Sequence, residues 1–165
     1  MKAVVVYESL WGNTAAVATA IADGLGEGAV ALSTLAADAA ALDGVELIVA
    51  GAPLLGFNLP TEEMRANIAK NAAGPKADFS SPSMRSWIAG LAPGGARFAA
   101  FETRIWWSPG SAPKHIAALL EEKGYHSVSA PERFIVTAKY GPLKAGELER
   151  ARAWGASLAR IGGAI

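Results

Sequence analysis

Five short and continuous apolar runs, separated by helical patterns, constrain the fold of this chain more than any other feature. The runs are Ala3–Tyr7, Ala29–Leu32, Leu47–Gly51, Phe98–Phe101 and Phe134–Thr137. An unbroken apolar run, in place of an alternating one, is typical of a parallel strand that is buried on both faces. The runs therefore predict a five-stranded parallel sheet with helices on both sides.

Helical patterns fill the intervals between these runs. The first begins at Asn13, repeats apolar residues every four positions and meets stop signals at Gly24 and Gly26. Strands that alternate with helices need right-handed crossovers, which place helices on both faces of the sheet. The expected fold class is therefore α/β, a doubly wound three-layer α/β/α sandwich. Further helices are expected over Leu35–Leu42, Thr61–Asn71 and Ser83–Leu91, and after Ser111 and Gly146.

Length and composition bound the kind of protein. A chain of 165 residues fits one domain, so a single domain over residues 1–165 is expected. The 15 Lys and Arg balance the 15 Asp and Glu, which argues against a general nucleic-acid binder. With no Cys and two His, no disulfide, thiolate nucleophile or metal site is expected. Neither a leader peptide nor a membrane segment is recognisable, so we expect a cytoplasmic protein.

The loop after the first run carries the clearest chemistry. It reads Glu8-Ser9-Leu10-Trp11-Gly12-Asn13-Thr14 and opens the first helix directly. A helix N-terminus presents free N–H groups to an anion, hydroxyl groups can donate further hydrogen bonds, and a glycine permits close approach of the backbone. This loop could therefore bind a phosphate. It contains no Lys or Arg, and dipoles would hold the anion. The alternative is that Asn13 or Thr14 caps the helix and Gly12 makes a turn.

At this loop the chain resembles the flavodoxins. Their phosphate loop follows the pattern Ser/Thr-x-Thr-Gly-x-Thr, which Ser9, Gly12 and Thr14 match, while Trp11 replaces the middle Thr. The chain has no G-x-S-x-G motif and no Ser–His–Asp arrangement, so the sequence does not favour a hydrolase. The resemblance continues through Leu47–Pro53, Phe98–Phe101, Phe134–Thr137 and Gly141-Pro142-Leu143.

This resemblance implies a flavodoxin-like fold that binds FMN without a covalent bond. The phosphate would lie on Ser9–Thr14, and the flavin ring between the loops after the third and fourth strands. Phe57, Trp106 and Trp107 would then offer the flat walls that such a ring needs. The candidate cofactor-binding residues are Ser9, Leu10, Trp11, Gly12, Asn13, Thr14, Pro53, Leu54, Leu55, Gly56, Phe57, Thr103, Arg104, Trp106 and Trp107. No catalytic residue and no metal ligand is expected.

Several of these residues have a plainer interpretation. Phe57 could pack the crossover, and Trp106 and Trp107 could plug a degenerate pocket. Arg104 could stabilise the reduced flavin and raise its potential, or it could pair with Glu8 or with Glu102.

Three functions therefore stay open. The first is an electron-transfer protein that serves a redox partner protein or a small acceptor. The second is an FMN-dependent NAD(P)H:quinone-type reductase. The third is a protein that has the fold but has lost FMN, which the departures at Trp11, Leu54 and Leu55 favour.

Overall fold

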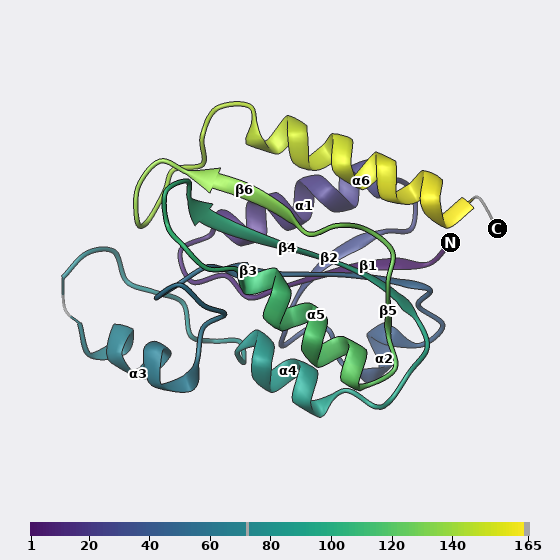
Figure 1. The fold of residues 1–165 in the computed structure, drawn as a ribbon, viewed down its shortest axis with the longest axis horizontal. Helices are drawn as coiled ribbons and strands as arrows, with labels where there is room; N and C mark the ends of the chain where they lie inside the picture. Colours follow the sequence, from purple (N-terminus) through teal and green to yellow (C-terminus); the bar gives the residue numbers. More distant parts are fainter. Residues whose placement is uncertain (72, 164–165) are drawn as a thin grey trace.

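A parallel sheet lies between two layers of helices in the computed structural model, which describes residues 1–71 and 73–163 (Figure 1). The strand order is β2-β1-β3-β4, and β5 and β6 both pair with β4 at the far edge. Every strand pairing is parallel, which confirms the predicted α/β class. The strands are β1 (Ala3–Tyr7), β2 (Val30–Ser33), β3 (Leu47–Pro53), β4 (Arg97–Ile105), β5 (His126–Ser127) and β6 (Glu132–Val136).

The last strand position is divided into two segments. β5 pairs with Arg97 and Phe98 at the start of β4, and β6 pairs with Phe101–Ile105 at its end. Between them stands Pro131, which has no backbone N–H to donate to a neighbouring strand. The prediction of one strand at Phe134–Thr137 therefore located the edge but missed β5 and its interruption.

The helices follow the predicted order. The expected helix over Leu35–Leu42 shortens to α2, because the Asp38 carboxylate accepts from the Ala41 amide at 2.9 Å and starts the helix there. No helix of the described chain is long and apolar enough to cross a membrane. The helices are α1 (Asn13–Leu25), α2 (Ala39–Leu42), α3 (Glu62–Lys70), α4 (Met84–Gly90), α5 (Ala112–Glu122) and α6 (Glu147–Gly163).

Glycine lets α1 and α6 pack backbone against backbone. A Cβ atom on Gly155 would lie 2.2 Å from the Ile21 carbonyl oxygen, and one on Gly24 would lie 2.0 Å from the Arg152 carbonyl oxygen. Of the two predicted stop signals, Gly26 is the C-cap of α1, whereas Gly24 lies inside the helix one residue before its end. This close contact fixes the direction of α1 and therefore the place of the loop before it.

Alternate residues of the central strands β1, β3 and β4 pack into two separate cores. Val4 and Val6 of β1 face the layer of α4 and α5, whereas Val5 faces α1 and α6. Both faces are buried, as unbroken apolar runs predict. In Figure 1, α3 and the segment after it lie at the end of the sheet to which the β4 and β6 arrows point. That end holds the candidate site.

Candidate functional site

The loop between β1 and α1 is folded back onto the start of the helix by one hydroxyl group. The Ser9 Oγ accepts hydrogen bonds from the Gly12 amide at 3.1 Å and from the Ala15 amide at 3.2 Å. Gly12 has φ of 92°, in the left-handed region that favours glycine. Gly12 is also the N-cap of α1, and the Ser9 hydroxyl takes over the bond to a first-turn amide that glycine, which has no side chain, does not make. The alternative in which Asn13 or Thr14 caps α1 is therefore wrong.

The side chains of Asn13 and Thr14 instead tie the loop to its surroundings. The Asn13 side-chain amide donates to the Tyr140 carbonyl oxygen at 3.0 Å. The Thr14 hydroxyl lies 2.8 Å from the Thr103 hydroxyl, in a buried contact with the end of β4. Three strand ends therefore meet at this loop.

Several backbone N–H groups of the loop have no acceptor. Within the part of the chain that the structure describes, the amides of Trp11, Asn13 and Thr14 donate no hydrogen bond. They belong to the end of α1 where the helix dipole is positive. A phosphate would satisfy these donors, so the loop fits the phosphate end of FMN.

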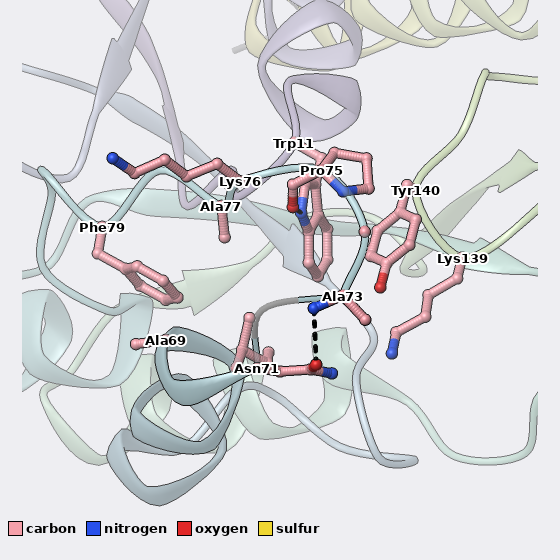
Figure 2. Close-up of a pocket in the computed structure, with 12 residues that line it drawn as sticks. Trp11, Ala69, Asn71, Ala73, Pro75, Lys76, Ala77, Phe79, Lys139 and Tyr140 are labelled. Atoms are coloured by element: carbon pink, nitrogen blue, oxygen red, sulfur yellow. Dashed lines mark hydrogen bonds between the residues drawn. The ribbon is translucent and has the colours of Figure 1, made fainter.

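Two contacts fix the Trp11 side chain against residues outside the loop between β1 and α1. Its indole Nε1 donates to the Pro75 carbonyl oxygen at 3.3 Å, and its ring meets the Tyr140 ring edge-on at 4.9 Å (Figure 2). Trp11 lines cavities of about 60, 380 and 610 Å³. Its indole therefore divides the space at the carboxyl ends of the strands.

The 60 Å³ cavity gathers most of the predicted site residues. This volume is well below the roughly 300–1,000 Å³ of small-molecule sites, so the residues fill the space with their own side chains. A flavin ring would need this space to open. The lining residues are Ser9, Leu10, Trp11, Asn13, Thr14, Pro53, Leu54, Leu55, Thr103, Arg104, Ile105, Val136 and Lys139.

The aromatic residues expected as walls lie elsewhere. Phe57, Trp106 and Trp107 are 58%, 74% and 63% exposed, and they do not line the 60 Å³ cavity. The two loops that carry them also touch, because a Cβ atom on Gly110 would lie 2.0 Å from the Phe57 carbonyl oxygen. The two loops therefore contact each other at Gly110 and Phe57, and a role for these aromatic residues in flavin binding stays a prediction.

Gly56 and Phe57 form the tip of a tight turn. The Leu55 amide donates to the Asn58 carbonyl oxygen at 3.0 Å, and the Asn58 amide donates back at 2.9 Å. Both central residues have positive φ, 52° for Gly56 and 67° for Phe57. Phe57 therefore has a backbone conformation that residues other than glycine rarely adopt, and its ring is exposed to solvent.

Arg104 is engaged by a carboxylate. Its Nη1 lies 2.9 Å from Glu102 Oε1 and also donates to the Gly110 carbonyl oxygen at 3.0 Å. The second Glu102 oxygen accepts from the Ala112 amide at 2.8 Å. Both side chains are buried, so the pair is internal, and the alternative that Arg104 pairs with Glu102 is confirmed. Because Glu102 neutralises its charge, Arg104 should have little effect on the redox potential of a flavin bound nearby.

Glu8 forms a second buried pair, with Arg65 of α3. Glu8 Oε2 lies 2.7 Å from Arg65 Nη1, and Glu8 Oε1 accepts from the Met84 amide at 2.9 Å. Arg65 also donates to the Ser81 carbonyl oxygen at 2.6 Å. Burial raises the pKa of the Glu8 carboxyl, and this outweighs the opposing effects of the Met84 amide and Arg65. The pair joins the end of β1 to α3 and α4.

Lys139 and Tyr140 border the site, although neither is among the site residues predicted from the sequence. They follow β6, and Lys139 lines both the 60 and the 380 Å³ cavities. The signal that could have found them is their position, since residues just after a parallel strand share an edge with every other strand end.

Comparison with known proteins bears on the fold. No protein-family model matches the chain, and no curated protein matches it. An archaeal flavodoxin structure is 24% identical with a TM-score of 0.69, over 98% of this chain and 99% of that one.

Two bacterial structures give similar values. Flavodoxin 2 from Bacillus cereus is 16% identical with a TM-score of 0.64, over 99% of this chain and 98% of that one. A WrbA-like flavodoxin from Agrobacterium tumefaciens is 21% identical with a TM-score of 0.63, over 98% and 97%. These likenesses extend over nearly the whole of each chain, and this chain therefore has the flavodoxin-like fold.

Proposed function

We propose that this protein binds FMN without a covalent bond and transfers electrons between a donor and a redox partner protein or small acceptor. The observation that carries the proposal is the set of free amides of Trp11, Asn13 and Thr14 at the positive end of α1. Structural neighbours that are named flavodoxins support the choice of FMN over other phosphorylated ligands.

The phosphate would be held by neutral groups alone. The loop has no Lys or Arg, so free N–H groups and the helix dipole supply the attraction. The Ser9 oxygen already accepts two amide hydrogens, which leaves its own hydroxyl hydrogen free to donate. FMN would supply the electron-accepting group, and the chain would position it and limit access by solvent and partners.

One observation favours a different outcome, a flavodoxin-like protein that holds no flavin. The space that the ring would need is a cavity of about 60 Å³, filled by Trp11, Leu54, Leu55 and their neighbours. On this alternative the loop would still attract a phosphate, but no ring would follow it into the cavity.

Titration of the flavin-free protein with FMN decides between the two. We expect one saturable site, seen as quenching of flavin fluorescence and as a rise in unfolding temperature. At a hundredfold excess over Kd the added stability is about 2.7 kcal/mol. If saturating FMN gives neither quenching nor stabilisation, the proposal fails and the flavin-free alternative stands.

Paired variants test the phosphate loop itself. Ser9→Ala removes a donor to a charged group, so FMN affinity should fall about tenfold or more. Thr19→Val is the matched control, because Thr19 is exposed on α1 and its hydroxyl donates to the Ala15 carbonyl oxygen. Equal FMN affinities in the two variants would show that Ser9 does not contribute to FMN binding. Consumption of NADPH with a quinone acceptor, at enzyme-like turnover, would instead identify the reductase.

A further inference from the structure

A cavity of about 380 Å³ lies beside the proposed FMN site and shares Trp11 and Lys139 with it. It is lined by residues of α3, by residues between 73 and 79 and by the loop after β6 (Figure 2). Its volume falls in the range of about 300–1,000 Å³ that is usual for small-molecule sites. Trp11 lines both this cavity and the 60 Å³ cavity, so its indole lies between the two spaces.

Three aromatic side chains from distant parts of the sequence form its walls. Figure 2 shows the Trp11 and Tyr140 rings side by side, with the Phe79 ring facing them across the cavity. Trp11 is fixed by its bond to the Pro75 carbonyl oxygen and by the Tyr140 ring. The Arg65 guanidinium lies 5.3 Å from the centre of the Phe79 ring. A flat ligand would therefore meet walls that are already in place, at little cost in ordering side chains.

The charged residues that line the cavity favour an anionic ligand. Lys76 and Lys139 are among its lining residues, and no Asp or Glu is. Lys139 runs beside Tyr140 at the rim, with its ammonium 5.4 Å from the Tyr140 ring centre, whereas the ammonium of Lys76 extends away from the rings (Figure 2). Aromatic walls alone would suit a cation. The uncompensated Lys139 ammonium makes a cation unfavourable and an anion favourable.

We propose that this cavity binds a planar aromatic anion, such as an aromatic carboxylate or sulfonate, as a second ligand distinct from FMN. The ring of the ligand would pack against Trp11 and Phe79. Its anionic group would lie at the rim, within reach of the Lys139 ammonium and the Tyr140 hydroxyl. The site requires no flavin, so it stands or falls separately from the proposed function.

Titration of the wild-type protein with β-naphthoate, with and without saturating FMN, tests this inference. Calorimetry and tryptophan fluorescence should report one saturable site in both conditions. Lys139→Met should weaken naphthoate binding about threefold to fivefold, the effect of one solvent-exposed ion pair. Lys114→Met is the matched control, because Lys114 is an exposed lysine that lines a different cavity. It should leave the affinity unchanged.

A second variant and a second probe separate ring recognition from charge recognition. Phe79→Ala should weaken naphthoate binding about twofold to tenfold by removing one wall. Neutral β-naphthalenemethanol should bind the wild type about as weakly as naphthoate binds Lys139→Met.

Three results would overturn the inference. They are no saturable binding at millimolar naphthoate, equal affinity in wild type and in both cavity variants, or competition between naphthoate and FMN. If FMN fails to bind while naphthoate binding still depends on Lys139, the proposed function fails and this second site remains.

Discussion

Replacing Trp11 by Thr should strengthen FMN binding while it weakens the folded state. Trp11 stands where the phosphate-loop pattern that this chain resembles has a Thr, and its indole lines the 60 Å³ cavity. The change should enlarge that cavity and add a hydroxyl to the loop. A hydrogen bond to a charged group contributes about 1.5–3 kcal/mol, so FMN affinity should rise by about tenfold to a hundredfold.

The cost to stability follows from the two contacts that the indole makes. The bond from Nε1 to the Pro75 carbonyl oxygen and the edge-on contact with Tyr140 are each worth about 0.5–1.5 kcal/mol. The free energy of unfolding of the flavin-free variant should therefore fall by about 1–3 kcal/mol. For a chain of this length each kcal/mol lowers the unfolding temperature by about 2–4 °C.

The assay combines FMN titration with thermal unfolding of the flavin-free protein. Trp11→Phe is the control, because it keeps an aromatic ring but adds no hydroxyl and loses the Pro75 bond. It should lose stability without a comparable gain in FMN affinity. If Trp11→Thr binds FMN no more tightly than Trp11→Phe, Trp11 does not stand in for a phosphate ligand, and the reasoning on this loop is refuted.

Three further changes test the packing, the electrostatics and the backbone. Gly155→Ala should lower the unfolding temperature, since its Cβ would fall 2.2 Å from a carbonyl oxygen of α1 and overpacking costs about 1–3 kcal/mol; Gly90→Ala, with open space around it, should not. Hydrogen bonding from Arg150 lowers the pKa of Glu147, so its contribution to stability is present above the unfolded pKa and is lost as pH falls through the folded pKa. Glu147→Gln should therefore destabilise the protein at neutral pH and converge with the wild type in acid unfolding curves; a pH-independent difference would contradict this. Phe57→Asn should raise the unfolding temperature by about 2–4 °C, because Asn tolerates the φ of 67°; an unchanged value would show that the turn carries no strain.

The sequence predicted the parts of the fold that depend on local patterns. Each apolar run gave a strand near its expected place, because burial on both faces requires an unbroken run. The misses depend on tertiary contacts. Nothing near Gly24 shows that it packs against Arg152 of α6, and the two-residue β5 exists only because Arg97 and Phe98 offer it a partner.

The site shows the same division between local and distant effects. The Ser9–Thr14 loop could be predicted because its hydroxyl groups and glycine stand at the start of one helix. The walls could not, because which aromatic ring faces the site depends on loop contacts far apart in sequence. Phe57 is exposed, with its backbone packed against Gly110, while the Tyr140 ring contacts Trp11.

Charge near the proposed flavin can now be assigned to a different residue. Arg104 was the expected cation, but Glu102 cancels it. Lys139 lines the same 60 Å³ cavity, is exposed and forms no ion pair with any described residue. An ammonium near the ring favours the reduced, more negative flavin, so Lys139→Met should lower the midpoint potential of the FMN-loaded protein.

The size of this shift is set by solvent. In water-like surroundings a unit charge about 4 Å away contributes about 1 kcal/mol, or about 40 mV for one electron. The shift should shrink as salt is added, because an exposed charge is screened. Lys114→Met is again the control, since Lys114 does not line this cavity. Equal potentials in the two variants, measured by equilibration with redox dyes at low salt, would show that Lys139 lies too far from the flavin to act on it.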